Sequence, residues 1–114
     1  MDSCIFCDII EKKAPANIEY EDDKVIAFHD TNPQAPLHVL VVPKLHIAKV
    51  ADVTASEAAL MGELIFRGRE IASERSEFGG SFRLVFNSGE MAGQTVYHIH
   101  LHVLAGRRME WPPG

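Results

Sequence analysis

Hydrophobic and polar positions follow two periods along the chain, one helical and one alternating. The helical period runs through residues 54–75, which open with Thr54-Ala55-Ser56-Glu57, a run that matches a capping box. The alternating period runs through residues 81–87 and 96–104. We therefore expect one long helix and two strands in the second half of the chain, with a loop over residues 88–95 between the strands.

The first half of the chain predicts shorter elements. Isoleucines at helical spacing favour a helix over residues 5–13, which stops before Pro15. Residues 18–20 and 25–28 are apolar runs around a polar turn and predict a β-hairpin, and residues 37–42 predict a central strand because they are apolar almost throughout. This order of elements predicts an α+β fold with a mainly antiparallel sheet.

Length, composition and charge narrow the class of protein. A chain of 114 residues with 46% hydrophobic and 24% charged residues predicts one globular domain over residues 1–114. A formal net charge of -5 argues against a nucleic-acid partner but is compatible with a single nucleotide. Neither a membrane-length apolar run nor a signal-peptide pattern occurs in the sequence, so we expect a cytoplasmic protein without a membrane partner.

Three of the six histidines occupy alternate positions in one expected strand, at His98, His100 and His102. Alternate residues of a strand share one face at a spacing of about 6.5–7 Å, so three imidazoles would line a surface while the intervening apolar residues enter the core. The pattern also fits a solvated strand face that is rich in histidine. A further alternative is a zinc centre, because a His-x-His pair on a strand can ligate one metal together with a third histidine from elsewhere.

The run from His98 to Leu104 resembles the signature of the histidine-triad superfamily, in which three histidines alternate with apolar residues. The resemblance extends to the Hint branch of that superfamily and covers nearly the whole chain. The matching segments are Ile5-Phe6-Cys7, Ala27-Phe28-His29-Asp30, Pro33-Gln34-Ala35-Pro36, Val41-Val42-Pro43-Lys44, His46-Ile47, Asn87-Ser88-Gly89, Gly93-Gln94-Thr95-Val96-Tyr97 and Trp111-Pro112-Pro113-Gly114.

The resemblance implies a five-stranded antiparallel sheet with one long helix and a short N-terminal helix. It also implies a homodimer in which two such sheets form one continuous surface. Residues 106–114 would form a C-terminal extension near the active site, where Trp111 reaches toward the partner subunit.

The resemblance further implies a purine nucleoside phosphoramidate hydrolase that cleaves the P–N bond of AMP-amine substrates. His100 would attack the phosphorus to form a nucleotidyl-histidine, and His102 would help to protonate the departing amine with support from Thr95. The second ring nitrogen of His100 needs an acceptor. A backbone carbonyl near His98 or the side chain of His38 would serve, and the sequence does not choose between them.

The nucleotide-binding residues carry over from the same resemblance. Asp30 would bind the ribose hydroxyls, and Gly93 would let backbone N–H groups approach the phosphate. Read locally, Asp30 is also a loop cap and Gly93 a turn residue, while the aromatic residues are core residues. The remaining nucleotide contacts would be Phe6, Ile9, Phe28, Ile18 or Leu40 for the base, and Asn87, Gln94, Thr95, His100 and His102 around the phosphate.

The two cysteines form a Cys-x-x-Cys pair at Cys4 and Cys7. In a reducing compartment this spacing suggests metal binding or redox chemistry more than a structural disulfide. Other members of the superfamily use such a pair for structural zinc, which would be completed here by His46 and His98. The alternative is a free dithiol. The chemistry itself requires no cofactor.

Three classes of function stay open at this point. The leading interpretation is a metal-free phosphoramidase. The others are a zinc-dependent hydrolase that uses the triad as ligands, and a dimeric nucleotide-binding interaction protein with little turnover.

Overall fold

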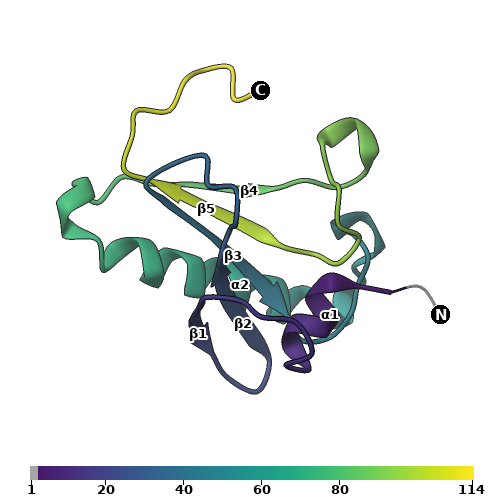
Figure 1. Ribbon diagram of the computed structural model, residues 1–114. Helices are drawn as coiled ribbons and strands as arrows, with labels where there is room; N and C mark the ends of the chain where they lie inside the picture. Colours follow the sequence, from purple (N-terminus) through teal and green to yellow (C-terminus); the bar gives the residue numbers. More distant parts are fainter. Residues whose placement is uncertain (1–2) are drawn as a thin grey trace.

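One antiparallel sheet of five strands forms the centre of the molecule (Figure 1), in a computed structural model that describes residues 3–114. The strand order is β1-β2-β3-β5-β4, so the last strand of the chain lies inside the sheet, between β3 and β4. The predicted α+β class, hairpin and central strand are confirmed. The strands are β1 (Ile18–Glu21), β2 (Val25–His29), β3 (Leu37–Pro43), β4 (Arg83–Phe86) and β5 (Leu101–Ala105).

Two α-helices of unequal length accompany the sheet, α1 (Ile5–Ile10) and α2 (Ala58–Ser73). Helix α1 is shorter than expected because the chain leaves helical geometry after Ile10, and Lys12 adopts a φ of 64°. Before α2, a 3-10 turn takes up the expected first turn of the helix. The Thr54 backbone N–H donates to the Glu57 carboxylate over 2.8 Å, as the capping box predicts.

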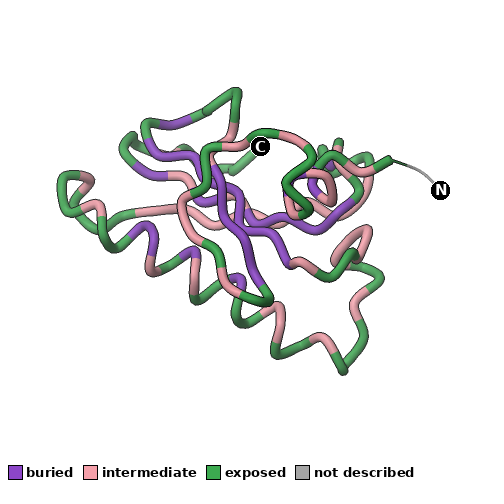
Figure 2. The backbone as a smooth tube through the Cα atoms, turned by 60° about the horizontal axis from the view of Figure 1, so that its bottom comes forward, coloured by how far each residue is buried: buried purple, intermediate pink, exposed green. Residues whose placement is uncertain are grey.

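The two helices cover opposite faces of the sheet. Alternation along β2 sends Val25 and Ala27 into the core against α2, while Ile26 and Phe28 pack with residues of α1. Figure 2 shows the central strands as an almost continuously buried stretch, since side chains from both layers cover them.

Helix α2 approaches β5 closely at Gly68. A Cβ atom at this position would lie 3.0 Å from a methyl group of Val103 and 3.1 Å from one of Leu101. The glycine therefore lets the helix backbone sit directly on the last strand, at a modest cost in helix propensity.

Strand β5 begins five residues later than the expected 96–104, at Leu101, so this boundary was wrong. The β3–β5 ladder ends at the pair Val41 and Leu101, and Pro43, two residues further along β3, has no backbone N–H to donate. Side-chain alternation nevertheless continues before the strand. The Ile99 N–H donates to the Ile47 carbonyl over 2.8 Å, and Ile99 stays buried on the α2 side.

Residues 106–114 follow β5 and contain neither helix nor strand. Trp111 in this extension is 84% exposed. Among the described residues, no helix has the length and apolar character that crossing a membrane requires.

Candidate active site

A cavity of about 540 Å³ opens between α1, the end of β2 and the segment before β5, and is called the triad cavity below. It brings together side chains that are far apart in the sequence. The residues expected at the nucleotide that line it are Phe6, Ile9, Phe28, Asp30, Thr95, His100 and His102.

One wall of the triad cavity is apolar. Phe6 and Phe28 meet edge to face with ring centroids 5.3 Å apart, and Leu40 completes the slot. Of the two alternatives left open by the sequence, Leu40 lines the cavity, whereas Ile18 lies 40% exposed outside it. Asp30 stands at the end of this wall, partly exposed.

His100 has its ring orientation and tautomer set by the backbone. Its Nδ1 lies 2.8 Å from the His98 carbonyl oxygen, and because a carbonyl can only accept, Nδ1 carries the proton. The lone pair is therefore on Nε2. Burial lowers the pKa of His100 below its ordinary value, which keeps the ring neutral and nucleophilic. The acceptor left open by the sequence is thus the backbone of His98 and not His38.

His38 forms its hydrogen bond with His102 and not with His100. The Gln34 N–H donates to His38 Nδ1 over 3.0 Å, so His38 holds its proton on Nε2 and donates it to His102 Nδ1, 2.9 Å away. His102 consequently carries its own proton on Nε2. Burial, followed by the neighbouring His100 and His38, lowers the pKa of His102 to about 4. Asp30 lies 3.4 Å from His38 Nε2 as a second, weaker acceptor.

The first triad histidine belongs to a different cluster. The ligand atoms of Cys4, Cys7, His46 and His98 all lie within 4.8 Å of one another. His98 donates from Nε2 to the Pro43 carbonyl over 2.8 Å, which leaves the Nδ1 lone pair facing the sulfur atoms.

The spacing of these four ligand atoms fits tetrahedral zinc. Sulfur-to-nitrogen distances are 3.4 Å for Cys4 to His98, 3.6 Å for Cys7 to His98 and 3.2 Å for Cys7 to His46. Zinc with ordinary bond lengths separates neighbouring ligands by about 3.3–3.8 Å. Without a metal, burial and the Cys4 contact raise the pKa of the Cys7 thiol to about 11, so metal binding would release protons.

Three of the expected nucleotide contacts lie outside the lining of the triad cavity. Asn87 follows β4 and is half-buried, and Gly93 is exposed with a φ of 93°. The buried Gln94 side chain donates to the Ala48 and Val96 carbonyls and accepts from the Gly89 N–H. Gln94 therefore holds the shape of the loop.

Sequence reasoning missed part of the cavity wall. Ile5 and Val96 line it, as does the turn Ala14-Pro15-Ala16 that follows α1. Small residues and a proline after a helix signal only a turn, so no local pattern could have placed them at the site.

A five-stranded antiparallel sheet with alternate histidines beside a cavity defines a histidine-triad fold and site. A family model described as "Scavenger mRNA decapping enzyme C-term binding" matches residues 3–111. A HIT-like protein of Synechocystis is 48% identical over 110 residues, which are 96% of each chain. The chain therefore belongs to this family within the histidine-triad superfamily.

Solved structures agree with this membership. A HIT family hydrolase from Legionella pneumophila superposes with a TM-score of 0.94 at 44% identity, covering 98% of this chain and 100% of that one. A zinc-bound histidine triad family protein from Mycobacterium smegmatis has a TM-score of 0.81 at 35% identity, covering 96% of this chain and 78% of that one. The protein is a HIT family hydrolase-like protein.

Proposed function

We propose that this protein is a purine nucleoside phosphoramidate hydrolase of the Hint branch, which cleaves the P–N bond of AMP-amine substrates. The observation that carries the proposal is the pair of fixed tautomers at the triad cavity. His100 has an Nε2 lone pair and His102 an Nε2–H, and both residues line the cavity. A nucleophile beside a proton donor suits substitution at phosphorus with departure of a poor leaving group.

The first step forms a bond between His100 Nε2 and phosphorus and breaks the P–N bond. The negative phosphate raises the pKa of His102 from its value of about 4 in the free protein, so His102 binds a second proton and gives it to the departing nitrogen. The products of this step are a neutral amine, a neutral His102 and the nucleotidyl-histidine.

The second step hydrolyses the covalent adduct. Water attacks phosphorus, its proton passes to His102, and His100 leaves as a neutral imidazole that still donates from Nδ1 to the His98 carbonyl. The proton that His102 gave up in the first step thus returns in the second, and one water is consumed for each nucleoside monophosphate formed.

Nucleotide recognition follows from the two sides of the triad cavity. The apolar slot of Phe6, Ile9, Phe28 and Leu40 would hold the purine, and the Asp30 carboxylate would accept from the ribose hydroxyls. Asn87, Gly93 and Gln94 would act from the neighbouring loop, Gln94 by shaping it.

Zinc and dimerisation complete the proposal. The Cys4, Cys7, His46 and His98 cluster would hold a structural zinc, which neutralises the thiolates and joins α1 to the sheet. We also propose a homodimer with one continuous sheet, in which residues 106–114 extend a single domain of residues 1–114 toward the partner's active site. Light scattering tests the dimer.

Steady-state hydrolysis of an adenosine phosphoramidate by wild type and His100→Ala, each with and without a chelator, tests the central proposal. We expect activity that survives the chelator and falls by about three orders of magnitude or more in the variant. Activity that persists without His100 would reject the nucleophile. Loss of kcat at saturating substrate on chelation would instead favour a zinc hydrolase, for which the ligand atoms of Asp30, His38 and His102 lie within 4.8 Å of one another.

A further inference from the structure

The two cysteines stand together at the start of α1. Cys4 is the N-cap of the helix, and its Sγ accepts from the Cys7 N–H over 3.3 Å. Both thiols are free and partly exposed, and their sulfur atoms lie within 4.8 Å of each other. Cys-x-x-Cys pairs at helix N-termini are also the reactive dithiols of disulfide oxidoreductases. The same two sulfur atoms can therefore serve as metal ligands or as an oxidisable dithiol.

A second cavity, of about 580 Å³, borders the metal cluster at Cys4 and His46. It shares Ile5 and Thr95 with the triad cavity, so the cluster and the proposed nucleotide site are close neighbours. The exposed Ser3 is also part of its lining. A small oxidant that enters this cavity can reach the Cys4 sulfur, and exposure of this kind favours oxidation.

The cysteine pair is connected to the proposed nucleophile by two short paths. Along the first, His98 places its Nδ1 3.4 Å from Cys4 Sγ, while its carbonyl oxygen accepts from His100 Nδ1 over 2.8 Å. Along the second, Phe6 lies between the two cysteines in the sequence, and its ring meets that of His100 edge to face with centroids 5.1 Å apart. A change at the sulfur atoms therefore reaches both the nucleophile and the apolar wall beside it.

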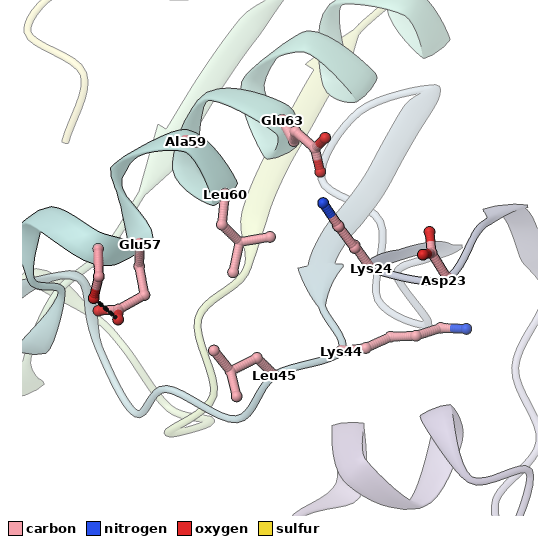
Figure 3. A pocket seen from close by; sticks show the side chains of 9 residues that line it. Asp23, Lys24, Lys44, Leu45, Glu57, Ala59, Leu60 and Glu63 are labelled. Carbon is pink, nitrogen blue, oxygen red and sulfur yellow. Dashed lines mark hydrogen bonds between the residues drawn. The ribbon is translucent and has the colours of Figure 1, made fainter.

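A chain of two exposed ion pairs also ties the turn after α1 to the sheet. Lys12 Nζ lies 2.6 Å from one carboxylate oxygen of Glu21, and Lys44 Nζ lies 2.8 Å from the other. Figure 3 shows Lys44 beside a separate cavity at the start of α2, with its side chain extending away from that cavity. Exposed ion pairs contribute little, whereas a metal with four protein ligands contributes much more. The cluster is therefore the stronger of these two links.

We propose that Cys4 and Cys7 are an oxidative modification site, at which hydrogen peroxide closes a disulfide, removes both sulfur ligands from the cluster and weakens nucleotide binding. The pair would thus regulate the triad cavity. This inference rests on the proposed zinc site and on the proposed function.

The oxidation consumes one peroxide for each chain. The Cys4 sulfur attacks a peroxide oxygen, so an S–O bond forms, the O–O bond breaks and hydroxide leaves. The Cys7 sulfur then attacks the Cys4 sulfur, so the S–S bond forms and a second hydroxide leaves. The two thiolates lose two electrons, the peroxide gains them, and two protons from solvent convert the hydroxides to water. Because only His46 and His98 then remain as ligands, the cluster no longer holds zinc.

The test treats zinc-loaded wild type with hydrogen peroxide and follows three quantities. We expect release of one zinc for each chain, loss of two hydrogen atoms from the peptide that contains Cys4 and Cys7, and AMP binding that is weaker by about tenfold. A colorimetric zinc indicator, mass spectrometry and calorimetric titration measure them in that order. A dithiol reductant with added zinc should reverse all three changes.

Three variants separate the cysteine pair from other effects of the peroxide. The double variant Cys4→Ser, Cys7→Ser should bind AMP as weakly as oxidised wild type and should not respond to peroxide. Met91→Leu removes an exposed, oxidisable side chain outside the cluster and should respond as wild type does. Lys44→Met breaks one of the exposed ion pairs and should keep AMP affinity within about twofold before treatment.

Several outcomes would overturn the inference. These are zinc and both thiols retained in excess peroxide, a disulfide between chains, or a disulfide within the chain at unchanged AMP affinity. Protein that takes up no zinc, or that binds no AMP in any state, would reject the site concerned and this inference with it. Reduced wild type that binds AMP but does not hydrolyse an adenosine phosphoramidate would reject the hydrolase alone, because zinc release and AMP affinity are measured without turnover.

Discussion

The two faces of the sheet come from the same strands but differ in composition. The face under α2 is built from aliphatic side chains, with Val39, Val41 and Val103 fully buried. The face under α1 mixes apolar residues with histidines, including His38 and His100. Strand alternation separates the two sets, so neighbouring residues such as Ile99 and His100 serve different faces.

The difference shows how a small domain can bury several histidines on one face of a sheet and still keep an aliphatic core on the other. On the α1 side, His98 Nε2 and His100 Nδ1 each form a hydrogen bond with a backbone carbonyl. Among residues 3–114, every buried side-chain nitrogen or oxygen atom has a hydrogen-bond partner. A buried donor or acceptor without a hydrogen-bond partner would lower the free energy of unfolding by about 1–3 kcal/mol. The aliphatic α2 face therefore supplies stability, and the α1 face supplies oriented reactive groups.

The largest effect is expected on the α2 face. Leu64→Ala removes a fully buried side chain and should lower the free energy of unfolding by about 2–5 kcal/mol, measured by urea denaturation. The folded variant should keep kcat near the wild-type value because Leu64 belongs to the core cluster under α2 and does not line the triad cavity. A large fall in kcat with unchanged stability would contradict the division between the faces.

His38→Ala tests the opposite face. It removes the donor to His102 Nδ1, so the tautomer of His102 is no longer held, and kcat should fall by about 10–100-fold with a small change in KM. Added imidazole should restore part of the rate by occupying the vacated space. A rise in KM alone would assign His38 to binding.

Metal removal tests how α1 is joined to the sheet. Chelation, or Cys7→Ser, should release α1, whose Phe6 and Ile9 line the triad cavity, and should weaken AMP binding by about tenfold. Calorimetric titration with AMP and metal analysis measure the effect, and added zinc should reverse it for the wild type only. Unchanged AMP affinity in fully metal-free protein would contradict this coupling.

Mild acid should destabilise the α1 face first. Burial lowers the pKa of His38, His98, His100 and His102 in the folded state below the unfolded value near 6.5. Between pH 6.5 and 4.5 the unfolded chain thus binds more protons, and the free energy of unfolding should fall as pH falls, by up to about 1.4 kcal/mol per pH unit for each histidine.

Urea denaturation of metal-free protein at several pH values measures this slope. His102→Gln should flatten the slope, because the residue with the pKa of about 4 no longer titrates. Stability that is constant over this range would contradict the lowered pKa values.

Much of the fold could be predicted because its signals are local. The capping box at Thr54, the polar turn before Val25 and the apolar run of β3 each act through neighbouring residues. The start of β5 was missed because it depends on where the ladder with another strand begins, and β3 pairs with β5 only from Leu101 onward. The role of Gln94 was missed for the same reason, since one of its partners is the distant Ala48 carbonyl.

The sequence by itself determined the alternation that puts three histidines on one face, the residue types that suit phosphorus chemistry, and a Cys-x-x-Cys pair able to bind metal. Only the tertiary structure decided the hydrogen-bond partners of the histidine rings. It pointed the Nδ1–H of His100 at a carbonyl and placed His38 behind His102. The physical reason is that a tautomer depends on the hydrogen-bond partners of both ring nitrogens, and folding brings those partners from distant parts of the chain.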